Sequence, residues 1–297
     1  MLRWTTAGAV PSPTTVQIRV QRSYPGRVRA GAPVPTRSMS TAELLDNIRF
    51  FTAGMRTPRT RPCETLVLSG VGVAAREDCP EAIALARSQG IARVILHAGV
   101  EDLDQLLPKA WVGAIDVLVV PVQPGGGTLA AAARALTAAR EAGLRVAANT
   151  TLSTAALPHL IAAARVLAAA RPHEVTFTYP FPINGADPTE VPTPARVEVA
   201  LRPALAVLDA AGLNVGIKGL PACLLGKEAL RLRRTANRWY VDADHQGAQA
   251  LLFFPDVVAF HKDEICRFCA ADERCDGFFS AYLRRPGAAQ LQPIDEP

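Results

Sequence analysis

The feature that most constrains the fold is a regular alternation of short apolar runs with helical stretches. Strands that alternate with helices at this spacing, roughly 25–35 residues, build βαβ units around a parallel sheet. Most of the runs are continuously apolar, as expected when helices cover both faces of the sheet. We predict seven strands, at residues 15–21, 65–68, 93–97, 116–120, 145–149, 175–178 and 214–217. The chain is therefore expected to be an α/β protein, and periodicity alone leaves open a full barrel, a partial barrel and a doubly wound sheet.

Local signals mark where the helices between these strands begin and end. One helix is expected to begin after Ser40, because Glu43 stands at the spacing of a capping box. A second opens at Pro80, which follows Asp78 and Cys79, and ends at Gly90. Further helices are predicted at about residues 128–142, 154–170 and 194–211, followed by glycines at 143 and 212.

The alternation divides the chain into three parts. Residues 1–14 contain two prolines and are expected to form a loose lead-in. Residues 15–217 carry the βα pattern, which breaks after Ile217. Residues 218–297 are interpreted as a small domain that caps one end of the sheet and has a Cys-rich tail. Within it, Trp239 and Tyr240 are interpreted as aromatic anchors in a surface loop.

The N-terminus indicates a cytoplasmic protein. Arg3 is followed by no apolar run, so no signal peptide is expected. The Ala-rich stretch 155–170 is interpreted as a packed helix, because it is interrupted by Pro158, His159 and Arg165. In a reducing compartment closely spaced cysteines indicate metal binding more than disulfides. We expect neither a membrane nor a nucleic acid as a partner.

Three closely spaced cysteines give the strongest chemical signal. Cys266, Cys269 and Cys275 fall within ten residues, in a polar turn sequence. Soft thiolates select zinc or iron–sulfur clusters, and either usually takes four ligands. Cys223 is the best fourth candidate, since it follows the last predicted strand. The remaining cysteines, Cys63 and Cys79, are interpreted as core residues. Spacing alone leaves zinc and iron–sulfur open.

The same residues resemble a known family. The segment GLPACLLG from Gly219, with FHKDEICRFC from Phe260 and the Cys275-Asp-Gly277 turn, resembles the C-terminal extension of radical-SAM enzymes, of the SPASM or twitch kind. Upstream, TLVLSG from Thr65 and FTYPFP from Phe177 are similar to strands of the family's barrel. The resemblance implies a partial (βα)6-type parallel barrel with a small C-terminal Cys-rich cap. It also implies one auxiliary [4Fe–4S] cluster held by Cys223, Cys266, Cys269 and Cys275.

Two departures from the family concern its SAM chemistry. The family holds its barrel cluster with a CxxxCxxC loop after the first strand, and here Ser23, Arg27 and Ala30 stand at those three spacings. The family's Gly-Gly-Glu-Pro motif after the second strand reads Gly-Val-Gly-Val from Gly70. Without thiolates the barrel cluster has no ligands, and SAM loses its chelator and electron donor. SAM is therefore not expected as a cofactor.

The resemblance and its departures together suggest a radical-SAM-like pseudoenzyme. It would bind one auxiliary cluster, cleave no SAM, and act as a binding or electron-transfer partner of an active radical-SAM enzyme or another enzyme that modifies a peptide or a natural product. The expected partner is therefore another protein, either an active radical-SAM enzyme or a peptide substrate. Two alternatives stay open: a stand-alone enzyme that uses the emptied barrel for another reaction, and a zinc-bound structural protein.

Three further residues are candidates for a pocket inside the barrel. Arg27 would project toward the vacated cluster position, where its planar fork suits an anion, unless the loop is an unstructured basic segment. His97 and Asn149 stand at the ends of predicted strands, the face where barrels place their active sites. Either residue can equally be a satisfied polar group at a strand end.

Overall fold

The structure is a computed structural model. This structure describes residues 2–5, 8–10, 13–21, 37–53, 61–125, 128–182, 190–235, 238–257, 259–283 and 290–295. Among these residues no helix is long and apolar enough to cross a membrane.

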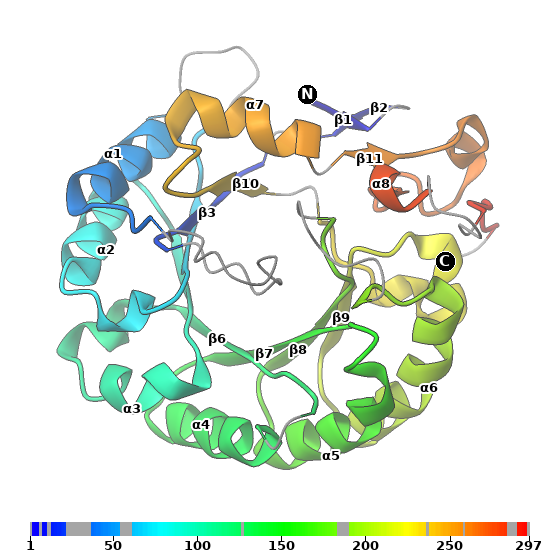
Figure 1. Cartoon of the computed structure of the whole chain (residues 1–297), viewed down its shortest axis with the longest axis horizontal. Helices are drawn as coiled ribbons and strands as arrows, with labels where there is room; N and C mark the ends of the chain where they lie inside the picture. The colour runs from blue at the N-terminus through cyan, green and yellow to red at the C-terminus, as the bar shows by residue number, and fades with distance from the viewer. Residues whose placement is uncertain are drawn as a thin grey trace, which may run out of the picture.

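The main sheet has eight strands, and every neighbouring pair in it is parallel. Its order is β10-β3-β4-β5-β6-β7-β8-β9, and Figure 1 shows it curling into a half-barrel. The α/β class and the partial barrel are thus confirmed. The strands are β3 Thr15–Arg19, β4 Thr65–Ser69, β5 Arg93–His97, β6 Val117–Pro121, β7 Val146–Thr151, β8 Glu174–Thr178, β9 Val215–Lys218 and β10 Arg238–Val241.

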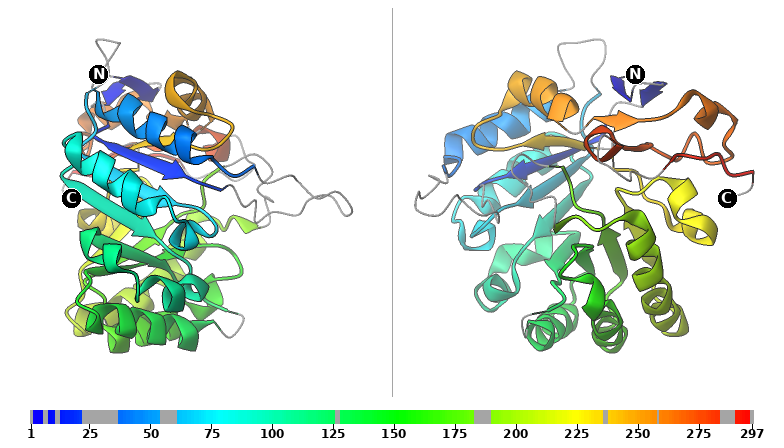
Figure 2. Two further views of the ribbon diagram at one scale, coloured as in Figure 1. Left: turned by 90° about the vertical axis from the view of Figure 1, so that its left-hand side faces the viewer. Right: turned by 45° about the vertical axis from the view of Figure 1, so that its right-hand side comes forward.

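Helices cover the convex side of the sheet, as the views in Figures 1 and 2 show. The capping box predicted at Ser40 and Glu43 is present at the start of α1. The helix predicted at Pro80 is present as α2, and it ends close to Gly90. The helices are α1 Thr41–Thr52, α2 Cys79–Ser88, α3 Leu103–Leu106, α4 Leu129–Glu141, α5 Leu160–Ala170, α6 Pro194–Ala210, α7 Gly247–Val257 and α8 Ser280–Leu283.

Side chains along each strand alternate between the core under the helices and the concave face of the sheet. On β3, Val16 and Ile18 belong to the buried apolar core, whereas Gln17 and Arg19 point to the opposite, concave face. On β5, Leu96 belongs to the core and His97 points inward. The main apolar core therefore lies between the sheet and the helices, and the concave face carries both polar side chains and apolar ones such as Val67.

Strand β10 is the one strand of this sheet that the sequence did not predict. It comes from the segment after Ile217 and pairs with β3, so that Trp239 lies beside Val16. Trp239 is only 1% exposed and packs on Phe51 of α1, with ring centroids 6.4 Å apart. Its interpretation as part of a surface loop was wrong. The run is too short to reveal a strand by periodicity, and its pairing partner lies more than 200 residues earlier.

A second, smaller sheet joins the two ends of the chain. Its order is β12-β11-β1-β2, with β1 Leu2–Thr5, β2 Gly8–Val10, β11 Phe260–His261 and β12 Phe278–Phe279. The expected lead-in thus contains two short strands, and β1 pairs in parallel with β11. Backbone pairing of this kind gives little signal in the sequence, because it depends on no particular side chain.

Candidate metal centre

The structure brings four of the six cysteines to one cavity. Cys223 lies in the short 3-10 helix η6 (Ala222–Leu224), which follows β9, and Cys266 lies in η8 (Glu264–Phe268). These two residues and the next two cysteines, Cys269 and Cys275, all line the same cavity. Figures 1 and 2 show the C-terminal segment running beside the segment that follows β9. These four residues are those that the sequence singled out.

The other two cysteines lie elsewhere. Cys63 and Cys79 are 3% and 0% exposed and belong to the apolar core between sheet and helices. Burial raises the pKa of Cys63 to about 12 and that of Cys79 to about 11. Both thiols therefore stay neutral at physiological pH, as expected of structural cysteines.

Backbone turns set the spacing of the three C-terminal cysteines. The amide N–H of Cys266 donates to the Asp263 carbonyl at 2.9 Å, and that of Cys269 donates to the Cys266 carbonyl at 3.0 Å. The amide of Cys275 closes the next turn on the Ala271 carbonyl at 2.9 Å. Successive tight turns of this kind direct neighbouring side chains to one side, so that all three thiols reach the cavity.

Two ion pairs fasten the turns to the rest of the chain. The buried carboxylate of Asp276 accepts the Thr235 amide at 2.6 Å and lies 2.7 Å from the Arg234 guanidinium. Lys262 Nζ lies 2.6 Å from Asp272 Oδ1. Asp276 directly follows Cys275, so its anchorage also holds that thiol in place.

Aromatic packing joins the same segment to the carboxyl end of β8. Tyr282 donates its hydroxyl to the Pro180 carbonyl at 2.7 Å and packs edge-on against Tyr179, with ring centroids 5.5 Å apart. Phe278 and Phe279, on β12, are fully buried beside them. Gly219 makes this packing possible, because a Cβ there would lie 3.1 Å from the Tyr179 side chain and 3.3 Å from Phe279.

Backbone amides surround the thiols. The Gly277 amide donates to Cys275 Sγ at 3.3 Å, and the Ile294 amide donates to Cys269 Sγ at 3.5 Å. Burial raises the pKa of Cys223, while the backbone of Gln292 acts in the opposite direction. The other three cavity cysteines raise the same pKa further, because four negative charges would repel one another in one place. A bound cation removes that repulsion and deprotonates a coordinating thiol outright.

The four cysteines line one cavity without forming a close group of ligands. Among the described residues, no three His, Cys, Asp or Glu side chains are grouped closely enough to hold a single metal ion. Sulfur ligands of one zinc ion each lie about 2.3 Å from it.

The barrel mouth contains the second position at which the sequence departs from the radical-SAM pattern. Gly70 and Gly72 follow β4 with positive φ angles of 115° and 68°, and η1 (Val73–Ala75) begins directly after them. Where the resembling family has a carboxylate, this turn has only glycine or valine. The other position, the loop with Ser23, Arg27 and Ala30, lies outside the described residues, so the anion site predicted at Arg27 stays a prediction.

The two strand-end residues singled out by sequence have different surroundings. Asn149 on β7 accepts a hydrogen bond from the Thr178 hydroxyl at 2.8 Å, so it is a satisfied polar residue between neighbouring strands. His97 on β5 is partly buried on the concave face. Burial lowers the pKa of His97 to about 3, and the positive charges of Arg238, Lys218 and Arg19 lower it as well.

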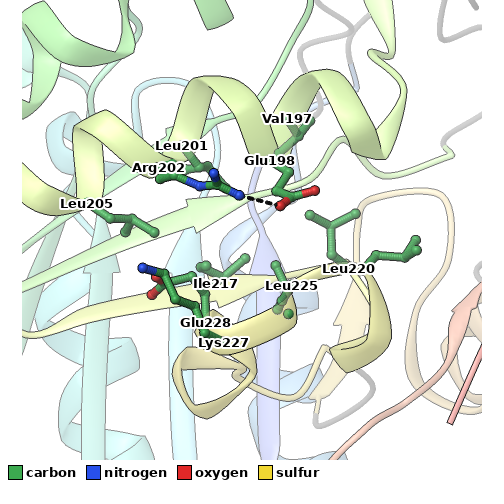
Figure 3. Close-up of a pocket in the computed structure, with 12 residues that line it drawn as sticks. Val197, Glu198, Leu201, Arg202, Leu205, Ile217, Leu220, Leu225, Lys227 and Glu228 are labelled. Carbon is green, nitrogen blue, oxygen red and sulfur yellow. Dashed lines mark hydrogen bonds and ion pairs between the residues drawn. The ribbon is translucent and has the colours of Figure 1, made fainter. Parts of the chain in front are cut away.

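A larger cavity of about 100 Å³ lies outside the sheet, between α6 and the 3-10 helices η6 and η7 (Gly226–Arg231). Figure 3 shows the apolar side chains that line it, among them Leu201, Leu205 and Leu220, and the ion pair of Glu198 with Arg202 at its edge. It contains neither a cysteine nor a histidine. The cavity also contacts the segment that follows Cys223, through Leu224 and Leu225.

Comparison with known proteins identifies the fold. No protein-family model matches the chain, and no curated protein matches it. Among solved structures, Streptococcus suis SuiB bound to its precursor peptide SuiA has a TM-score of 0.60 at 10% identity, over 93% of this chain and 74% of that one. The same protein bound to S-adenosylmethionine has a TM-score of 0.55 at 10% identity, over 93% and 75% of the two chains.

A second neighbour covers nearly all of both chains. The structure of anSMEcpe with bound AdoMet and the Kp18Cys peptide has a TM-score of 0.55 at 9% identity, over 94% of this chain and 92% of that one. SuiB and anSMEcpe are radical-SAM enzymes. The chain therefore has the fold of the radical-SAM superfamily.

Proposed function

We propose that this protein is a radical-SAM-like pseudoenzyme that binds one auxiliary-type [4Fe–4S] cluster and cleaves no SAM. In this proposal it serves as a binding or electron-transfer partner of an active radical-SAM enzyme or another enzyme that modifies a peptide or a natural product. The observation that carries the proposal is the convergence of Cys223, Cys266, Cys269 and Cys275 on one cavity.

The residues around the cavity fit a four-iron cluster. Four thiolates satisfy one [4Fe–4S] cluster, and hydrogen bonds to the sulfurs help to set its reduction potential. The amides of Gly277 and Ile294 already donate to two of the four sulfurs. When bound, the cluster would supply one-electron transfer.

The proposal that SAM is not cleaved rests on two separate replacements. The three positions that correspond to the family's cysteine loop are Ser23, Arg27 and Ala30, none of which ligates iron. The turn at Gly70 and Gly72 contains no carboxylate to receive the amino group of SAM. Either replacement alone would weaken SAM chemistry, and together they remove its electron donor and part of its binding site.

A peptide or protein partner is favoured by two observations. Both structural neighbours have been solved with a peptide bound. In this chain, Ile265 and Phe268 flank Cys266 and are 49% and 69% exposed. Apolar side chains exposed beside a redox centre allow a partner to approach it closely.

The first test concerns SAM itself. After anaerobic reconstitution and reduction with dithionite, the protein incubated with SAM should form no 5′-deoxyadenosine above the level of a protein-free control. The physical reason is that SAM can accept an electron for cleavage only from a cluster that chelates it. Product is measured by liquid chromatography with mass detection.

A matched variant makes this result informative. Cys266→Ala should give the same absence of 5′-deoxyadenosine, because the auxiliary cluster is not expected to cleave SAM. Multiple turnovers by the unmodified protein, lost in Cys266→Ala, would contradict the pseudoenzyme proposal and show that this cluster performs the cleavage.

A further inference from the structure

The cavity that the four cysteines line also has one cation and one anion in its wall. Among the described residues that line it, Lys262 and Asp272 are the charged side chains other than cysteine. Lys262 directly follows β11, and the Asp272 amide donates to the Cys269 carbonyl at 2.9 Å. The proposed function gives neither residue a role, although both stand where a bound cluster would sense their charges.

Asp272 holds the ammonium group of Lys262 in a fixed place. Lys262 Nζ donates to the backbone carbonyl of Asp272 and to its carboxylate Oδ1, each at 2.6 Å. The two charges are unequally covered, because the Lys262 side chain is 13% exposed and that of Asp272 is 40% exposed. Water therefore screens the carboxylate more than the ammonium. The ammonium dominates on the buried side of the pair.

Gly277 lets the stem of Lys262 pass close to one of the thiols. Gly277 has a positive φ of 84°, and a Cβ there would lie 2.9 Å from Lys262 Cγ and would clash with the His261 carbonyl oxygen. The amide of the same glycine donates to Cys275 Sγ at 3.3 Å. Burial raises the pKa of Cys275, whereas nearby backbone groups and the positive charge of Lys262 act in the opposite direction. Lys262 thus lies beside Cys275.

Fixed charges in the wall of such a cavity affect electron transfer. An iron–sulfur cluster gains one negative charge when it accepts an electron, and its reduction potential depends on net charge and on solvent exposure. A nearby cation favours the reduced form, and a nearby anion favours the oxidised form. Both effects are stronger where water is excluded.

We propose that Lys262 raises the reduction potential of the bound cluster, and that Asp272 limits this effect while it holds Lys262 in position. The inference rests on the proposed function, because it requires a cluster at the four cysteines. In the step concerned, one electron enters from an external one-electron donor, the bonds to the thiolates stay intact, and no proton or group is transferred. Lys262 thereby sets how readily the protein accepts an electron from its partner enzyme.

Redox titration of the full chain, reconstituted without oxygen, tests the proposal. Dithionite is the reductant, and visible absorption together with electron paramagnetic resonance of the reduced form gives the midpoint potential. Lys262→Met keeps the stem and removes the charge. It should make reduction about tenfold less favourable, a potential about 59 mV lower for one electron. Asp272→Asn keeps an acceptor for Lys262 Nζ and removes the negative charge, so it should make reduction about threefold more favourable.

The opposite signs of these two shifts separate charge from packing, because loss of a structural contact would move both potentials in the same direction. Lys262→Arg keeps the positive charge and should change the equilibrium by no more than about twofold. Arg202→Met is the matched control, since it removes a cation from the exposed ion pair of Glu198 and Arg202 on α6 (Figure 3). It should leave the potential unchanged.

The outcomes distinguish this inference from the proposed function. A cluster whose potential moves in the same direction in Lys262→Met and Asp272→Asn, or in neither, overturns the inference alone. If Lys262→Met holds no cluster, Asp272→Asn decides: a higher potential supports the inference, and an equal or lower one overturns it. Absence of the chromophore from the unmodified protein overturns the proposed function and, with it, this inference.

Discussion

Replacing Cys266 or Cys269 by alanine is expected to abolish the brown chromophore that anaerobic reconstitution with iron and sulfide should give the unmodified protein. Each substitution removes one of four thiolates around the cavity. A [4Fe–4S] cluster needs a ligand for each iron, and the remaining cavity residues offer no other soft donor. The measurement is the visible absorption of the reconstituted protein, normalised to protein concentration.

Cys63→Ala is the matched control for these two variants. It also removes one thiol, but from the apolar core, where Cys63 is 3% exposed and burial raises its pKa to about 12. It should therefore leave the chromophore unchanged and lower only the stability of the fold. Circular dichroism of each variant establishes that it is folded. A chromophore that survives in both Cys266→Ala and Cys269→Ala, or is lost in Cys63→Ala, would contradict the assignment of ligands.

Trp239→Ala is expected to lower the free energy of unfolding by about 3–5 kcal/mol, the usual cost of removing a large buried aromatic side chain. Trp239 is 1% exposed and lies between β10 and Phe51 of α1. Its removal would leave a cavity under the strand that forms one edge of the half-barrel. Urea unfolding of the protein without metal, followed by circular dichroism, measures the change.

Phe268→Ala is the control, since it removes an aromatic ring that is 69% exposed. Surface substitutions usually change stability by no more than about 0.5 kcal/mol, and this one should do the same. If Trp239→Ala cost no more than Phe268→Ala, β10 would not be packed on α1 as the structure has it.

The parallel sheet was predictable from the sequence because its strands are local and apolar. The seven predicted runs all coincide with strands from β3 to β9. Five of them are followed by a helix with its own start or stop signals, such as the capping box of Ser40 and Glu43. In these strands and helices the local sequence pattern agrees with the tertiary structure. Such elements can therefore be predicted from the sequence.

Strand β10 and the N-terminal strands were not predictable for the opposite reason. Arg238 and Tyr240 alternate with Trp239 and Val241 over only four residues. So short an alternation is found in many loops, and only pairing with β3 makes it a strand. The short strands β1 and β2 pair with each other, and β1 also depends on a partner at the other end of the chain, β11.

The candidate metal centre was predictable as a set of residues but not as a geometry. The spacing of Cys266, Cys269 and Cys275 is local, and Cys223 was added from its place after the last strand. The fastening of Cys275 through Asp276 depends on Thr235 and Arg234, about forty residues away, and has no signature in sequence.

The most direct test of the account is the quantitation of iron, sulfide and zinc in protein purified and reconstituted without oxygen. Four cysteines around one cavity predict about four iron and four sulfide per chain, because that is the content of one [4Fe–4S] cluster. About one zinc per chain without iron would contradict the account and favour a structural zinc protein. About eight iron per chain would equally contradict it, because a second cluster would then occupy a barrel that has lost its cysteine loop.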